Sequence, residues 1–175
     1  MADGTLKQVN PFSGTEVWTV PGRGNRPLAA AGAPPEPLAP GAHTDTCNFC
    51  EARKLNTPPE KSRLVADGEG FAILRDAMPD ELDNTVAEFR RVPNLFEIVS
   101  YDYWQKNYGY EMPTARRVHM ERYLADPAGR EHVLETVRTR LAAAGQDPDR
   151  PEEELLELAP AYFGGGHDVI IGRRH

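Results

Sequence analysis

The spacing of hydrophobic residues predicts a set of short strands in this chain. Residues 15–20 alternate between apolar and polar side chains, as a half-buried strand does. Turn-forming residues precede them, so a hairpin is predicted over residues 8–20. Pro93 argues for an edge strand or a bend at its position. Further strands are predicted over residues 71–76, 88–92, 96–100 and 168–172.

The pattern changes to a helical period between residues 101 and 163. A short aromatic helix is predicted over residues 101–108, and another over roughly 115–125, with Thr114 as its N-cap. Asp126 and Pro127 predict a third helix start, because proline fits the first turn. A further helix is expected after Pro151. The apolar face of the third helix is predicted to contain Val133, Leu134, Val137, Leu141 and Ala144. The sequence therefore predicts an α+β fold with a mostly antiparallel sheet.

Composition excludes several classes of protein. The chain has 175 residues, which suits one domain, and a net charge of -7. Proteins that bind nucleic acid through its phosphates are usually basic, so no nucleic-acid partner is expected. No apolar run approaches the roughly 20 residues of a membrane helix, so no membrane partner is expected either. The N-terminus has no signal-peptide pattern, and a cytoplasmic location is predicted.

The two cysteines, Cys47 and Cys50, form a C-x-x-C motif. Two thiolates on one turn can provide half of a tetrahedral shell for a soft or borderline cation, and the five histidines are the obvious source of further ligands. A redox dithiol and a pair of structural thiols are the alternatives. A redox motif normally opens a helix directly after a strand. Here the motif follows a linker-like stretch over residues 28–41, which favours a metal-binding turn between loops.

A glycine-containing loop places Arg23 and Arg26 three residues apart. Guanidinium groups match phosphate oxygens in a bidentate way, and glycine lets the backbone approach a ligand. By itself, this pattern fits an ordinary surface loop better than an anion-binding site.

Several motifs, taken in order, resemble the N-terminal half of galactose-1-phosphate uridylyltransferase and its relatives in the histidine-triad superfamily. The segments that carry the resemblance are Asn10-Pro11-Phe12-Ser13-Gly14, Arg23 with Arg26-Pro27, Cys47-Asn48-Phe49-Cys50, Asn56-Thr57-Pro58-Pro59-Glu60, Val92-Pro93-Asn94-Leu95-Phe96, and Gly166-His167-Asp168-Val169-Ile170-Ile171 before His175. Residues 1–175 would then form one uridylyltransferase-like domain, with residues 101–163 as a helical insertion.

The resemblance implies a function and a set of site residues. It implies a structural zinc ion bound by Cys47, Cys50 and His175. The nucleotide would be bound by Arg23 and Arg26, through its phosphates, and by Asn94, which would line its pocket. The reaction would transfer a nucleoside monophosphate between sugar phosphates through a histidine intermediate, so a nucleotide sugar and a sugar phosphate are the expected partners. Many relatives are homodimers, and a homodimer is compatible with the resemblance.

The catalytic part of the family pattern is missing from this sequence. No two of its histidines are separated by one residue, so the H-x-H that carries the nucleophile is not present. His167 is the nearest candidate, but the resemblance makes it the residue before a strand. The chain stops directly after a predicted core strand, and it is expected to be the N-terminal half of a longer enzyme. The alternative is a non-catalytic, zinc-stabilised nucleotide-binding module, and a third reading is a domain whose C-x-x-C binds zinc only for stability.

Overall fold

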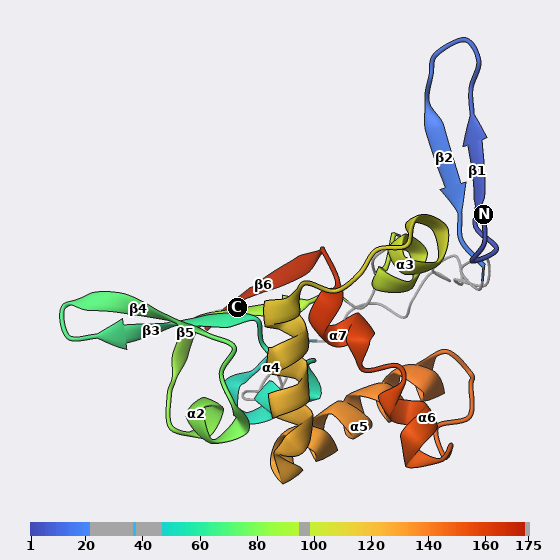
Figure 1. Cartoon of the computed structure of the whole chain (residues 1–175). Helices are drawn as coiled ribbons and strands as arrows, with labels where there is room; N and C mark the ends of the chain where they lie inside the picture. The colour runs from blue at the N-terminus through green and yellow to red at the C-terminus, as the bar shows by residue number, and fades with distance from the viewer. Residues whose placement is uncertain (22–36, 38–46, 95–98, 174–175) are drawn as a thin grey trace.

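Two antiparallel sheets form the β part of the structure. The computed structural model describes residues 1–21, 37, 47–94 and 99–173. A separate hairpin of β1 (Leu6–Val9) and β2 (Glu16–Thr19) projects away from the rest of the chain (Figure 1). The larger sheet has the strand order β4-β3-β5-β6. Its strands are β3 (Ser62–Asp67), β4 (Gly70–Arg75), β5 (Ala87–Pro93) and β6 (Asp168–Gly172).

The strand predictions are confirmed except at β3 and around Pro93. The predicted hairpin and the segments 71–76, 88–92 and 168–172 correspond to observed strands. Strand β3 was not predicted, and β5 is an inner strand that ends at Pro93 rather than an edge strand. The predicted strand 96–100 falls mostly outside the described residues, and its last two residues are not in a strand.

The helices follow the predicted order closely. Asp126 caps α5 as predicted, since its carboxylate accepts a hydrogen bond from the Gly129 amide at 2.8 Å. Pro113, rather than Thr114, is the N-cap of α4. The predicted last helix is divided into two short ones. The helical elements are η1 (Glu51–Asn56), α2 (Pro79–Asp83), α3 (Tyr101–Tyr108), α4 (Thr114–Ala125), α5 (Pro127–Ala143), α6 (Glu152–Leu156) and α7 (Pro160–Gly164).

The main hydrophobic core lies between the helices. It is formed by Tyr123, Val133, Leu134, Val137, Leu141, Leu155, Ala159, Tyr162 and Phe163. Burying each large aliphatic side chain contributes about 1.5–3 kcal/mol, so this cluster is a main source of stability. Four of the five residues predicted for the α5 face belong to it, whereas Ala144 is exposed because α5 ends at Ala143.

The helices α2, α4 and α5 lie on one side of the four-stranded sheet (Figure 1). The predicted α+β class is therefore confirmed, while the interpretation of residues 101–163 as an insertion stays a prediction. In the part of the chain that the structure describes, no helix combines the length and the apolar character needed to cross a bilayer.

Candidate functional site

The C-x-x-C motif forms a tight turn directly before η1. The amide of Cys50 donates to the carbonyl of Cys47 at 3.4 Å, and the amide of Arg53 donates to the carbonyl of Cys50 at 2.8 Å. Both cysteines are partly buried. Burial, together with the neighbouring Cys47 thiol, raises the pKa of the Cys50 thiol above its usual value. A raised pKa disfavours the thiolate that a redox-active thiol needs, and a metal ion would also have to displace the proton of this thiol.

The donor set at this turn fits a metal ion in part. Cys47 and Cys50 lie close enough for their thiols to hydrogen-bond, which matches two adjacent corners of a tetrahedral zinc shell. Among the described residues, no group of three or more histidine, cysteine or acidic side chains could hold a metal ion. The predicted third ligand, His175, lies outside those residues, as do Arg23 and Arg26.

A buried carboxylate joins the segment after η1 to the sheet. Glu60 is 2% exposed and accepts two hydrogen bonds from Arg63, at 2.9 and 3.0 Å, and one from Arg90, at 2.5 Å. Burial by itself would raise the pKa of Glu60, but the hydrogen bonds and charges of the two arginines outweigh it and lower this pKa. Glu60 is therefore ionised at neutral pH, and its charge balances buried positive charge on β3 and β5.

Arg90 also fixes the C-x-x-C turn in place. Its guanidinium donates to the carbonyl of Phe49 at 3.3 Å, to that of Lys54 at 2.8 Å and to the hydroxyl of Thr57 at 2.6 Å. With Glu60, one buried side chain on β5 thus connects the turn, η1 and the following loop. The turn has little regular structure of its own, so these bonds determine its position relative to the sheet.

Helix α5 is attached to the same point through His132. Its two ring nitrogens lie 2.8 Å from the Thr57 carbonyl oxygen and 2.8 Å from the Tyr123 hydroxyl. A carbonyl only accepts, so Nε2 donates to Thr57 and Nδ1 accepts from Tyr123. Burial lowers the pKa of His132, which agrees with this neutral tautomer. The observed role of His132 is therefore structural.

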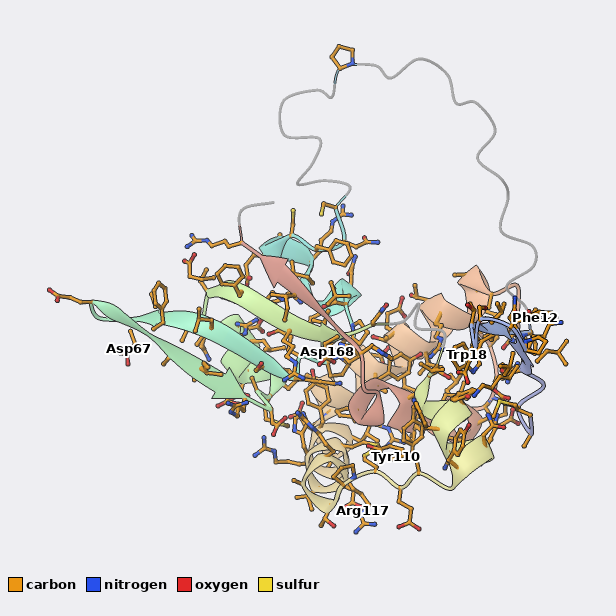
Figure 2. The ribbon with its side chains drawn as sticks, turned by 90° about the horizontal axis from the view of Figure 1, so that it is seen from above. Phe12, Trp18, Asp67, Tyr110, Arg117 and Asp168 are labelled. Carbon is orange, nitrogen blue, oxygen red and sulfur yellow. The ribbon has the colours of Figure 1, made fainter. Side chains whose placement is uncertain are left out.

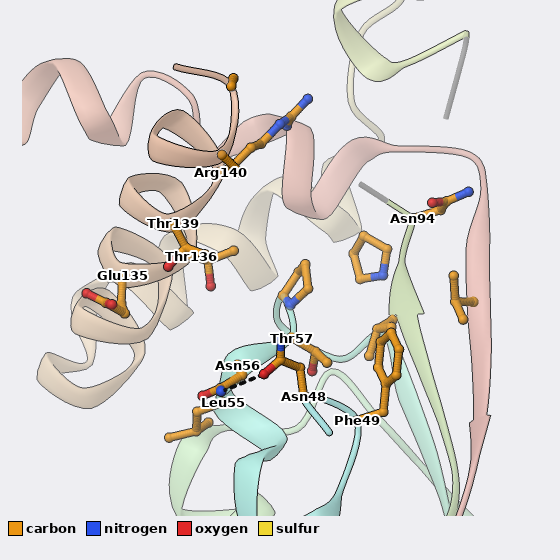
Figure 3. Close-up of a pocket in the computed structure, with 16 residues that line it drawn as sticks. Asn48, Phe49, Leu55, Asn56, Thr57, Asn94, Glu135, Thr136, Thr139 and Arg140 are labelled. Atoms are coloured by element: carbon orange, nitrogen blue, oxygen red, sulfur yellow. Dashed lines mark hydrogen bonds between the residues drawn. The ribbon is translucent and has the colours of Figure 1, made fainter. Parts of the chain in front are cut away.

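A pocket of about 580 Å³ opens where these segments meet (Figure 3). One wall carries Asn48 and Phe49 from the C-x-x-C turn, and another is formed by the ends of β5 and β6. Helix α5 faces them with Glu135 and Thr139, and Arg140 lies at the upper end of the same helix wall. Most of the lining is apolar, while amide, hydroxyl and charged groups are placed around it.

Asn94 lies on this pocket, where β5 ends. Its backbone N–H donates to the carbonyl of His167 at 3.0 Å, which holds the end of β5 to the start of β6. Opposite the strand end, the side chain of Asn56 donates to the Asn48 side chain at 3.3 Å (Figure 3). The structure therefore brings the predicted nucleotide residue Asn94 to the same cavity as the C-x-x-C turn.

A second ion cluster supports the start of β6 beside the pocket. The Lys61 ammonium lies 2.5 Å from the Asp168 carboxylate and donates to the Gly165 carbonyl at 2.5 Å. Arg91 donates to the other oxygen of Asp168 at 2.6 Å. These contacts fix the glycine-rich segment that precedes β6. His167, the exposed residue directly before this strand, is held in place with it.

Sequence reasoning did not find several residues that build this site. It assigned no role to Arg63 or Arg90. The pocket wall on α5 was also not predicted, since Glu135 and Arg140 look like ordinary surface residues of an amphipathic helix. The one available signal was Glu60, which ends one of the motifs that carry the resemblance.

Comparisons with known proteins place the chain in a family. No curated protein and no solved structure matches it. A family model described as a domain of unknown function (DUF4921) matches residues 1–175, and the chain therefore belongs to this family.

Proposed function

We propose that this chain is the zinc- and nucleotide-binding half of a nucleotidyltransferase of the galactose-1-phosphate uridylyltransferase type. The observation that carries the proposal is the shared pocket. The C-x-x-C turn and Asn94 belong to two separate motifs of the resemblance, and both contribute to one cavity. Its volume of about 580 Å³ is within the range of small-molecule sites, roughly 300–1,000 Å³.

The lining of the pocket suits a nucleotide base. Phe49, Val92 and Val169 offer apolar surface against which a flat ring can pack. The side-chain amides of Asn48 and Asn94 can donate to and accept from the polar edge of a base. A pocket with apolar walls and a few directed polar groups is the usual form of a small-ligand site.

The metal and phosphate contacts would come from the other residues of the resemblance. Cys47, Cys50 and His175 would hold a zinc ion whose contribution is structural, because it would fasten the turn to the chain after β6. Zinc binding would release the protons of both thiols, against the burial that raises the pKa of Cys50. Arg23 and Arg26 would neutralise the phosphates of the ligand, as guanidinium groups do in phosphoryl transfer.

The transfer step requires a histidine that these 175 residues do not supply. In the uridylyltransferase family that the chain resembles, an imidazole attacks the α-phosphorus and a sugar phosphate leaves. The covalent intermediate divides one difficult step into two. The lack of an H-x-H in this sequence favours a second candidate function, a non-catalytic nucleotide-binding module. The two functions share the pocket and differ only in turnover.

Calorimetric titration of the zinc-loaded protein with uridine diphosphate glucose, and with its adenosine counterpart, tests the proposal. Saturable binding of at least one is expected, and Asn94→Ala should weaken it about tenfold, since a directed hydrogen bond to a ligand contributes about 1.4 kcal/mol. Asn84→Ala is the matched control, because Asn84 is exposed at the end of α2 and does not line the pocket. Absence of binding to both nucleotides would contradict the proposal.

A further inference from the structure

The four-stranded sheet has one apolar face that no described helix covers. The strand register pairs Leu64 with Ile73 on one side and with Phe89 on the other, so all three side chains share a face. Phe71 is two residues from Ile73, and Ile170 pairs with Arg91, two residues from Phe89, so both join the same face. We call these five residues the open sheet face.

The two faces of the sheet differ sharply in exposure. Phe71, Ile73, Phe89 and Ile170 are 66%, 57%, 51% and 62% exposed. The opposite face carries Arg63, Arg90, Val92 and Ile171, which are all buried. Seen from above, α2 lies behind the strands of this sheet (Figure 2). An antiparallel sheet normally places polar side chains on its solvent face, so this face has the composition of a buried surface.

The size of the open sheet face fits half of an interface. Its four large exposed side chains present roughly 400 Å² of apolar surface, because an aromatic side chain contributes about 200 Å². The largest patch on a typical monomer is about 300–600 Å² and is often functional. A standard interface buries about 800 Å² on each partner, so these side chains would form its apolar centre and about half of its area.

The charges around the face are arranged for pairing with a second copy of the same chain. The turn between β3 and β4 carries the exposed acidic residues Asp67 and Glu69 (Figure 2). The opposite end of the strands carries Arg75 and Arg91 on the open side. Arg91 is paired with Asp168, whereas exposed Arg75 forms no ion pair with any described residue.

We propose that the open sheet face is the interface of a homodimer. A two-fold axis that lies between two such sheets and runs across the strands reverses the strand direction. Each copy then places Glu69 over the partner's Arg75 and Phe71 over the partner's Ile73, while the two copies of Phe89 lie near the axis. Such an isologous contact needs a self-complementary surface, and this face has one. The resemblance allows a homodimer but assigns it no surface.

Sedimentation velocity of the 175-residue chain at increasing concentration tests this interface. The expected result is a reversible species with twice the monomer mass of 19.4 kDa. Phe89→Glu should raise the dimer dissociation constant at least about 30-fold, since it removes a central anchor and buries a charge. Phe12→Glu is the matched control, because Phe12 is 98% exposed at the tip of the β1-β2 hairpin. It should leave the dissociation constant unchanged.

A charge exchange tests the geometry independently of the core residue. Glu69→Lys and Arg75→Glu should each weaken the dimer, and the double variant should restore it. This restoration would support the proposal even if Phe89→Glu failed to fold. A wild-type protein that stays monomeric, a larger aggregate, single and double charge variants that behave alike, or a dimer sensitive to Phe12→Glu but not to Phe89→Glu would each overturn the proposal.

Discussion

Replacement of Arg90 by alanine should destabilise the protein strongly and release the C-x-x-C turn. Arg90 is 3% exposed and its guanidinium donates to Glu60, to two carbonyls of the turn and η1, and to the Thr57 hydroxyl. Removing one member of a buried ion pair typically costs 3–5 kcal/mol, because the other charge stays buried. Glu60 keeps its two hydrogen bonds to Arg63, so the expected loss is at the lower end, about 3 kcal/mol.

The neighbouring arginine provides a matched control. Arg91 has a side chain that is 43% exposed, and its partner Asp168 retains Lys61 when Arg91 is removed. An ion pair of this kind contributes about 0–1 kcal/mol, so Arg91→Ala should have a small effect. Both variants remove one arginine from β5, so the difference between their stabilities measures the effect of burial rather than of charge.

Urea unfolding followed by circular dichroism measures both variants. Arg90→Ala should lower the free energy of unfolding by about 2–3 kcal/mol more than Arg91→Ala does. Hydrogen exchange should also show faster amide exchange at residues 50–57 in Arg90→Ala and an unchanged rate in Arg91→Ala. Equal and small losses in the two variants, with no change in exchange at the turn, would refute the assigned role of Arg90.

Three other predictions concern pH, packing and metal. Burial lowers the pKa of His132 below its ordinary 6.5. As the pH drops below about 6.5, the unfolded chain therefore binds a proton before the folded protein does, and the free energy of unfolding should fall. His132→Gln should flatten this pH dependence in urea titrations between pH 7.5 and 5. A Cβ at Gly129 would lie 2.2 Å from the Tyr123 carbonyl oxygen, so Gly129→Ala should cost about 2 kcal/mol in thermal unfolding, although alanine normally stabilises a helix by about 1 kcal/mol. Cys50→Ser should abolish a 1:1 zinc content measured by elemental analysis, whereas His167→Asn should retain it; equal zinc in the two variants would contradict the zinc assignment.

Local patterns were sufficient to predict most of the elements. The capped start of α5 at Asp126 and the hairpin turn at Ser13-Gly14 are determined by residues next to one another, and the structure confirms both. Strand β3 was missed because Arg63 occupies a buried strand position, where a cation breaks the apolar pattern. Burial of that cation depends on Glu60, whose own burial is set by the rest of the fold.

The candidate site was predictable only where its residues form short motifs. Cys47, Cys50 and Asn94 belong to such motifs, and the structure places Asn94 and the C-x-x-C turn at one pocket. Arg90 and His132 could not be assigned from sequence, since a charged or titratable residue reveals its burial only through distant partners. The pocket wall on α5 was missed for the same reason.

The proposed function depends on nucleotide binding in the pocket between the C-x-x-C turn, the end of β5 and α5. Two-dimensional amide NMR of the zinc-loaded protein, titrated with uridine diphosphate glucose, tests it most directly, because the side-chain amides of Asn48, Asn56 and Asn94 report on the pocket itself. Saturable shifts of these three signals are expected, with the signal of Asn84 unchanged. Absence of shifts, or shifts centred on the β1-β2 hairpin, would contradict it.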